Sequence, residues 1–251
     1  MSAQVSSETS EFERGLLSAQ PPRTLRLGGE FIDACDFAAE IQKSPRPRRD
    51  VLAAALDGID RRFQRERRRR KVGRAYDMAL EIARVVQRGS EVLDVGCGNG
   101  FIAHHLSALL GAAVSGIDLE ESTEAPINYA PYDGKRFPAE SKSFDAVLLC
   151  YVLHHAQDVS VMLKEIRRVL REGGLAIIYE DIPETWWDRF VCSIHNQQWK
   201  DRTGVCTFRD ESEWRRLFED FGFEIRSERQ LSRMRNLTHP VRRRFFVLRA
   251  P

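Results

Sequence analysis

The stretch Glu91-Val92-Leu93-Asp94-Val95-Gly96-Cys97-Gly98-Asn99-Gly100 decides the fold of this chain of 251 residues. Its valines and leucine suit a buried parallel strand. The three glycines lack a Cβ, so the backbone can turn sharply and a ligand can lie against it. Apolar side chains then recur at helical spacing over residues 102–110, and the free amide groups of a helix start would point into the turn. The stretch predicts a strand, a ligand-binding turn and a helix.

Two carboxylates indicate which ligand the turn holds. Asp94 stands two residues before the first glycine, and Asp118 follows a second apolar run at residues 112–117. A carboxylate at the end of a second strand can accept hydrogen bonds from a ribose diol. The competing interpretation is a dehydrogenase, whose dinucleotide cofactor would place a pyrophosphate at the start of the helix. An acid beside the helix start disfavours a pyrophosphate there. We expect a phosphate-free, cationic nucleoside, and S-adenosylmethionine fits that description.

Four stretches in this order resemble the class I S-adenosylmethionine-dependent methyltransferases, type 11-like, with a short connection between the second and third strands. They are residues 92–100, 116–118, 143–147 and 168–174. The resemblance implies an α/β, Rossmann-like, doubly wound seven-stranded sheet. The sheet is mostly parallel with an antiparallel last strand, helices on both faces and an N-terminal helical cap. It also implies S-adenosyl-L-methionine as the cofactor of a methyl transfer.

The same resemblance places the cofactor contacts on the strand ends and the loops that follow them. The expected contacts are Asp94, Val95, Gly96, Cys97, Gly98, Gly100, Asp118, Leu119, Asp133, Gly134, Cys150 and Tyr151. Asp133 is placed to bind the adenine amino group, but an Asp-Gly turn explains Asp133-Gly134 without a ligand. Only nine residues separate Asp118 from Asn128, so we expect a turn there rather than a helix.

Composition restricts the class of protein. The net charge is +2 and 42% of residues are hydrophobic, which suits a soluble domain without a strong global field. The five cysteines are scattered without a C-x-x-C pair, so we expect neither a disulfide framework nor a metal site. The N-terminus lacks the pattern of a secretory signal, which predicts a cytoplasmic protein.

Periodicity suggests three parts. Residues 1–29 are polar and interrupted by Pro21-Pro22, which predicts a mobile tail. Residues 30–88 read as an N-terminal helical cap, with a short helix at 31–42, one from Asp50 and another at 72–86. Residues 89–251 then form the methyltransferase domain, with a substrate-side insert at 182–209.

Basic residues crowd the cap between Arg61 and Lys71. The simpler interpretation is a solvated helix face with Arg stems over apolar surface. The alternative is an anionic partner, either a membrane surface or a nucleic acid.

The predicted fourth strand, Phe144–Cys150, ends beside His154 and His155, which are candidate catalytic bases. His-His pairs are frequent here in the family, so one ring could simply hydrogen-bond the loop. No Asn/Asp-Pro-Pro-aromatic run follows this strand, which counts against methylation of adenine or glutamine amides. Glu180, at the end of the predicted fifth strand at 175–179, is either a substrate contact or a loop hydrogen bond.

Within the insert, residues 182–207 are rich in aromatic side chains, and we expect irregular chain there. Trp186, Trp187, His195 and Trp199 are candidate substrate contacts in an apolar lid, although Trp186 and Phe190 also follow the spacing of an ordinary core helix. Trp187 could instead enter a membrane surface. Beyond the insert, Asp210 and Glu213 predict a capping box, and residues 223–225 with 245–248 predict a closing antiparallel hairpin.

We therefore expect an S-adenosylmethionine-dependent methyltransferase acting on a small molecule, at oxygen, with a flat or lipid-like acceptor. It would be cytoplasmic and peripheral to the membrane. The alternatives are an RNA or protein methyltransferase that uses residues 61–71, and a cofactor-binding regulator without turnover.

Overall fold

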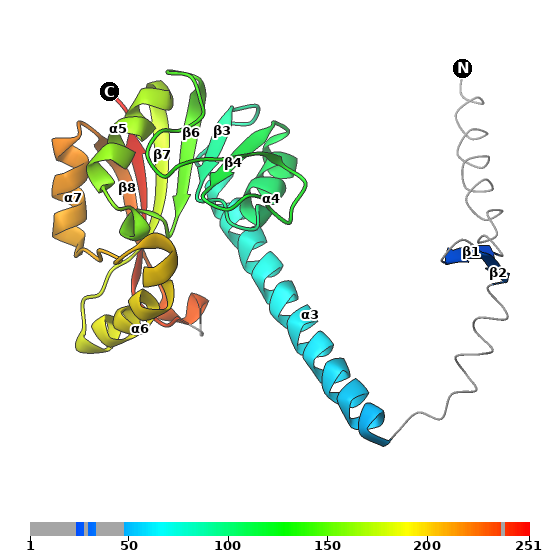
Figure 1. Cartoon of the computed structure of the whole chain (residues 1–251). Helices are drawn as coiled ribbons and strands as arrows, with labels where there is room; N and C mark the ends of the chain where they lie inside the picture. The colour runs from blue at the N-terminus through cyan, green and yellow to red at the C-terminus, as the bar shows by residue number, and fades with distance from the viewer. Residues whose placement is uncertain (1–23, 28–29, 34–47, 237–238) are drawn as a thin grey trace, which may run out of the picture. The chain divides into compact units, whose positions relative to one another are not determined.

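A computed structural model of the chain describes residues 24–27, 30–33, 48–236 and 239–251 (Figure 1). The chain divides into two compact units, residues 1–65 and 66–251, and the boundary lies inside the long helix α3, Arg48–Ile82. In the first unit, strands β1 (Thr24–Leu27) and β2 (Glu30–Asp33) pair antiparallel. Among the described residues no helix is both long and apolar enough to cross a bilayer.

The second unit contains a seven-stranded sheet of order β5-β4-β3-β6-β7-β9-β8. Its strands are β3 (Val92–Val95), β4 (Val114–Asp118), β5 (Asn128–Pro131), β6 (Phe144–Cys150), β7 (Leu170–Asp181), β8 (Glu224–Leu231) and β9 (Arg243–Arg249). The ladder from β5 to β7 is parallel, and β9 runs antiparallel between β7 and β8. The strand order reverses at β3, between β4 and β6, and in open α/β sheets ligands bind outside the carboxyl ends of the strands at such a point.

Helices cover both faces of this sheet (Figure 1). Helices α5 (Val159–Val169) and α7 (Glu211–Asp220) pack on one face through Leu163, Trp214 and Phe218. Helix α4 (Phe101–Leu110) and the end of α3 pack on the other face through Leu106 and Ile82. Because both faces are buried, the central strands are almost uniformly apolar.

Helix α6 (Trp186–Thr203) follows β7, and two short 3-10 turns complete the elements, η1 (Leu153–His155) and η2 (Arg233–Arg235). The four cysteines within the described part of the chain are free.

The predicted fold class is confirmed. Strand β6 has the predicted bounds, the short connection between β4 and β5 contains no helix, and the capping box of Asp210 and Glu213 starts α7. β8 and β9 form the predicted closing hairpin.

Three parts of the chain were predicted wrongly, which are the paired strands β1 and β2, the helix α3 and the helix α6. Residues 24–27 are a strand rather than tail, and 30–33 are a strand rather than the start of a helix. The rest of the predicted tail and of the 31–42 helix lies outside the described residues. One helix, α3, replaces the two predicted ones, because the Arg-rich stretch between them favours helix and the single Gly73 does not interrupt it.

The third correction concerns residues 186–203, which form helix α6 where irregular chain was expected. Thr185 caps this helix by accepting a hydrogen bond from the backbone amide of Asp188, whose side chain accepts one from the amide of Thr185 in return. This capping box uses Asp at the third position instead of Glu or Gln, so the pattern was missed.

Candidate functional site

A cavity of about 1120 Å³ opens at the carboxyl ends of the parallel strands. The glycine turn after β3, the loops after β4 and β5, the 3-10 turn after β6, and α6 all contribute to its wall. Ligand pockets usually have volumes of roughly 300–1,000 Å³, so this one can hold two small molecules together.

The glycine turn brings bare backbone close to the cavity. A Cβ built on Gly96 would lie 2.5 Å from a methyl carbon of Val152, and the residue has a φ of +66°. A Cβ on Gly98, by contrast, would meet nothing within 4 Å. Gly96 is therefore required by packing, whereas Gly98 leaves free the space that a ligand could take.

Asp94 is a buried acid with an unusual pKa. Its side chain is 1% exposed, and neither carboxylate oxygen has a hydrogen bond of normal geometry to the described residues. Burial, with a smaller contribution from the charge of Asp118, raises the pKa of Asp94 from 3.8 to about 7. Such a group gains most from a nearby cation, and the sulfonium and ammonium groups of S-adenosylmethionine would supply one.

Asp118 ends β4 and lines the cavity. One carboxylate oxygen accepts a hydrogen bond of 2.7 Å from the amide of Gly98, and the other accepts one of 2.7 Å from the amide of Leu119. These bonds tie the acid to the glycine turn and fix its orientation. Each carboxylate oxygen can accept a further hydrogen bond, which suits a ribose diol.

Asp133 and Gly134 also line the cavity. The Oδ1 atom of Asp133 accepts hydrogen bonds of 2.9 Å from the amides of Lys135 and Arg136, which lower its pKa. The turn role expected of this residue is therefore present, and its place on the cavity wall leaves adenine binding as a prediction.

The predicted cofactor residues thus fall into two groups. Those on the cavity wall are Gly96, Gly98, Asp118, Leu119, Asp133, Gly134 and Tyr151. Those outside the wall are Asp94, Val95, Cys97, Gly100 and Cys150.

Tyr151 has a φ of +65°, a strained conformation for a residue with a side chain, and its backbone amide donates a 2.9 Å hydrogen bond to the carbonyl of Tyr179.

His154 is buried on the wall of the same cavity. Its Nδ1 lies 2.7 Å from Oε2 of Glu180, whose Oε1 accepts a hydrogen bond from the amide of Leu153. Burial by itself would lower the pKa of His154, but the charge and hydrogen bond of Glu180 raise it. The other ring nitrogen, Nε2, is buried and has no hydrogen-bond partner among the described residues.

His155 faces a histidine from helix α6. Its Nε2 lies 3.2 Å from Nε2 of His195, and its Nδ1 lies 3.0 Å from the hydroxyl of Thr203. Burial and the neighbouring His154 lower the pKa of His155 to about 3 and that of His195 to about 4. Both imidazoles are therefore neutral at pH 7.

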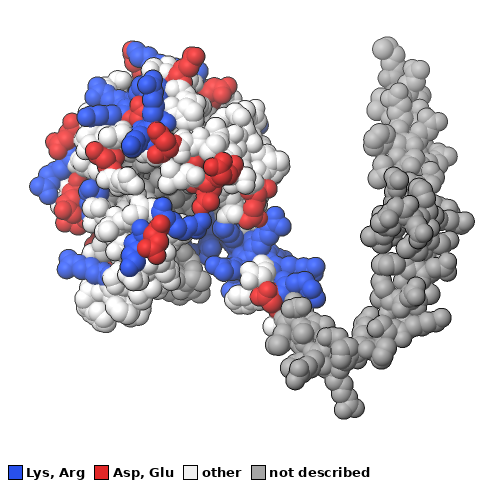
Figure 2. Space-filling view, in the orientation of Figure 1, with Lys and Arg blue, Asp and Glu red and all other residues white. Residues whose placement is uncertain are grey.

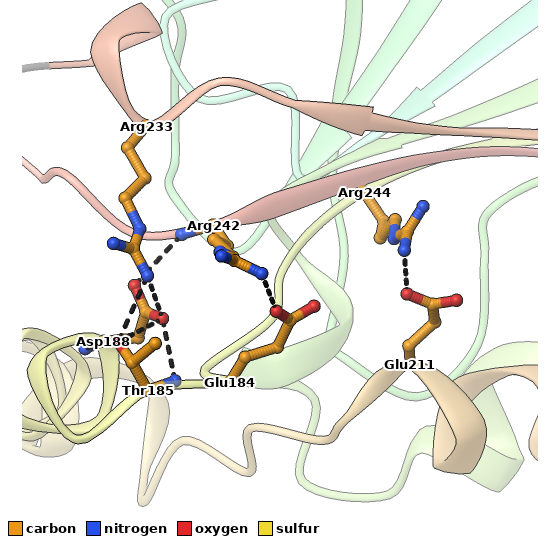
Figure 3. A network of polar contacts seen from close by, with 7 residues as sticks. All are labelled: Glu184, Thr185, Asp188, Glu211, Arg233, Arg242 and Arg244. Atoms are coloured by element: carbon orange, nitrogen blue, oxygen red, sulfur yellow. Dashed lines mark hydrogen bonds and ion pairs between the residues drawn. The ribbon is translucent and has the colours of Figure 1, made fainter.

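A polar network fixes the start of α6, and with it the place of His195 (Figure 3). Arg233 of η2 donates to the hydroxyl of Thr185 at 3.1 Å and to Oδ2 of Asp188 at 2.7 Å. Arg242 pairs with Glu184, just before the helix. The start of the helix that supplies His195 is therefore held by side chains from the last part of the chain.

The predicted substrate residues separate in the structure. His195 and Trp199 lie on the cavity wall, and their rings stack with centroids 5.9 Å apart. Glu180 lies outside the wall and holds His154. Trp186 and Trp187 also lie outside it, and the Trp186 side chain is 77% exposed.

Among the wall residues that sequence reasoning missed are His239 and Arg243. Both reach Asp181, His239 by an Nε2–Oδ2 contact of 2.8 Å and Arg243 by an Nε–Oδ1 contact of 3.0 Å. Burial alone would raise the pKa of Asp181, but these two partners lower it. No motif marks them, because they join the site only through the pairing of β9 with β7.

Comparisons with known proteins agree with this geometry. A family model described as a methyltransferase domain matches residues 63–228, more than half of the chain. The demethylmenaquinone methyltransferase of Staphylococcus aureus (strain JH9) is 28% identical over 168 residues, which cover 55% of this chain and 69% of that protein.

Solved structures share the fold. The S-adenosylmethionine-dependent methyltransferase of Methanosarcina mazei has 20% identity and a TM-score of 0.55, and the match covers 67% of this chain and 96% of that one. That of Mesorhizobium loti has 16% identity and a TM-score of 0.50, with 64% and 91% covered. The chain belongs to the methyltransferase-domain family, as a class I S-adenosylmethionine-dependent enzyme. Its cofactor is S-adenosylmethionine, and the dehydrogenase interpretation was wrong.

Proposed function

We propose that this enzyme transfers the methyl group of S-adenosylmethionine to an oxygen atom of a flat, lipid-like small molecule. The observation that supports this most directly is the single cavity shared by two sets of side chains. Gly98, Asp118 and Asp133 form the half suited to a cationic nucleoside. His155, His195 and Trp199 form the half suited to an acceptor.

The acceptor half combines an aromatic wall with polar groups. Trp199 and Tyr132 offer flat apolar surface to a ring, and His155, His195 and His239 add polar rings beside its oxygen substituents. The Staphylococcus aureus relative is named for a quinone, a flat acceptor, which is consistent with this assignment.

The transfer is an in-line displacement. An acceptor hydroxyl gives up its proton to solvent, its oxygen bonds to the methyl carbon, and the carbon–sulfur bond breaks to leave S-adenosylhomocysteine. The chain supplies chiefly position, because holding donor and acceptor in line removes much of the entropic cost.

The test measures S-adenosylhomocysteine formed with a panel of phenols and hydroxyquinones, with and without isoprenoid tails. Hydroxylated flat acceptors should be methylated, and their O-methyl ethers should be inert. Turnover with the blocked ethers would overturn oxygen as the acceptor atom. Calorimetric binding of S-adenosylmethionine without turnover on any acceptor would favour the regulator instead.

We also propose that the enzyme is cytoplasmic and acts at an anionic membrane surface, from which a lipid-like acceptor would come. Lys and Arg side chains gather over the described part of α3 (Figure 2), and Arg67 and Lys71 lie at the cavity. On α6, Trp186, Phe190 and Ile194 recur every four residues and are 77%, 51% and 44% exposed. Exposed apolar residues together with basic charge suit an anionic bilayer.

Co-sedimentation with vesicles tests this proposal. Binding to phosphatidylserine vesicles should exceed binding to phosphatidylcholine vesicles, weaken with salt, and fall in a Trp186→Ser, Phe190→Ser double variant. Equal binding to both vesicle types would overturn it. Tighter binding to RNA than to either vesicle would instead favour the RNA methyltransferase alternative.

A further inference from the structure

Three histidines from two separate segments meet on the cavity wall. His154 and His155 come from η1, and His195 comes from α6, some forty residues later in the chain. One ring nitrogen from each lies within 4.8 Å of the others. We propose that these three imidazoles bind one divalent transition-metal ion, with Zn²⁺ as the best fit.

The distance between the facing nitrogens suits such an ion. Metal–nitrogen bonds of about 2.0–2.1 Å at tetrahedral angles separate two ligand nitrogens by about 3.3 Å. Nε2 of His155 and Nε2 of His195 lie 3.2 Å apart. A hydrogen bond between the two rings would give the same distance, so this pair alone does not distinguish the two cases.

His154 supplies a second observation in favour of the ion. Its Nε2 is buried without a hydrogen-bond partner among the described residues, although the residue lies on the cavity wall. A hydrogen bond between His155 and His195 would leave this nitrogen unsatisfied, which is costly in a buried position. A metal ion shared by the three rings satisfies all of them.

Glu180 prepares His154 for this role. Its carboxylate binds Nδ1 of His154 at 2.7 Å, which fixes the proton on that nitrogen and leaves the lone pair on Nε2. A carboxylate that holds the distal nitrogen of a ligating histidine is a recurrent arrangement in metal sites. Its negative charge also offsets the charge of a bound cation.

Three imidazole ligands leave a tetrahedral ion one open position. A water molecule or an oxygen of the acceptor could occupy it, so the ion would bind hydroxylated acceptors through oxygen. This use in turnover depends on the proposed function, whereas binding of the ion itself does not.

The test uses the full chain, free of any affinity tag, stripped with a chelator and titrated with Co²⁺, which gives intense visible bands in a tetrahedral site. We expect one equivalent bound, a visible spectrum, and displacement by Zn²⁺. His155→Gln and His195→Gln should each weaken binding at least tenfold and abolish the spectrum. His104→Gln, an exposed histidine on α4, is the matched control and should bind like the wild type.

Circular dichroism and calorimetry with S-adenosylmethionine check that each variant folds. If His155→Gln fails to fold, His195→Gln decides. Absence of stoichiometric Co²⁺ binding to the wild type overturns the site, as does an unchanged spectrum in folded His195→Gln. Loss of methyl transfer with the Co²⁺ spectrum retained would count against the proposed function alone.

Discussion

Glu180 and His154 form a fully buried pair, with 2.7 Å between Oε2 and Nδ1, and the same carboxylate accepts a hydrogen bond from the amide of Leu153. The sequence left Glu180 open as a substrate contact or a loop hydrogen bond, and the structure gives it the second arrangement. Its importance should therefore appear in stability as well as in activity.

Replacing Glu180 by Gln should lower the free energy of unfolding by about 1–3 kcal/mol, because a buried charge-assisted bond is lost. Urea denaturation measures the change. The matched control is Glu172→Gln, which removes an exposed ion pair with Lys142 and should cost less than about 1 kcal/mol. Equal losses in the two variants would contradict the special role of the buried pair.

Asp94 should make the stability of the cofactor-free chain fall with rising pH. Its pKa is about 7 in the folded chain and 3.8 in the unfolded one, so between these values unfolding releases a proton. Asp94→Asn should remove this dependence and be more stable than the wild type at pH 8, by at most on the order of 4 kcal/mol. Denaturation of both proteins from pH 5 to 8 compares the slopes, and parallel slopes would contradict the prediction.

Cofactor binding should also release a proton near pH 6.5, because a cation near Asp94 favours the ionised carboxylate. Calorimetry in two buffers of different ionisation enthalpy measures the release. Asp94→Asn should show none, and an identical proton release in that variant would place the effect on another group.

Gly96 and Gly98 should respond differently to substitution. Both have positive φ, so alanine costs about 1–2 kcal/mol at either position. At Gly96 the new methyl group also meets Val152, which adds about 1–3 kcal/mol of overpacking. Gly98→Ala should instead weaken S-adenosylmethionine binding at least tenfold with the smaller stability loss. Thermal melts measure the loss of stability, and calorimetry measures the loss of cofactor binding. Tight binding of S-adenosylmethionine by Gly98→Ala would contradict the prediction that the cofactor occupies the space beside Gly98.

Asp188→Ala should loosen α6, because this side chain both completes the helix cap and pairs with Arg233 (Figure 3). Hydrogen exchange over residues 186–203 should accelerate while the sheet stays protected. Glu213→Ala, which removes the residue at the equivalent third position of the α7 capping box, is the control and should affect residues 211–220 only. Unchanged protection of α6 in Asp188→Ala would show that other contacts hold the helix.

Trp199→Leu should raise the KM for a water-soluble flat acceptor about tenfold, because Trp199 lines the cavity. Trp186→Leu should leave that KM unchanged, since its side chain is 77% exposed and outside the wall. Steady-state kinetics with a short-chain acceptor gives both values. A raised KM in Trp186→Leu alone would instead support the sequence-based hypothesis that Trp186 belongs to a lid over the acceptor.

The central half of the fold could be predicted because its signals are local. The alternation of apolar runs, glycines and carboxylates around Leu93 and Asp118 specifies strand, turn and acid within a few residues. Parallel strands then bring their carboxyl ends to one edge, and Gly98, Asp118 and Asp133, which the family resemblance named together, all line the cavity there.

The acceptor half could not be predicted in the same way. His195 reaches His155 only because α6 folds back from the end of β7, and His239 reaches Asp181 only because β9 inserts beside β7. Contacts between residues so far apart in sequence produce no periodic pattern in the sequence from which they could be predicted. The expectation of no metal site considered only cysteine spacing, so it did not address the meeting of distant imidazoles and stays untested.

The two sides proposed for the cavity come from consecutive parts of the chain, most of the nucleoside side from residues 96–152 and most of the acceptor side from residues 154–243. Evolution could therefore exchange the later segment by recombination and inherit the donor machinery intact. A new acceptor would require a new α6 and a new final hairpin, while the glycine turn and its acids passed unaltered from ancestor to descendant.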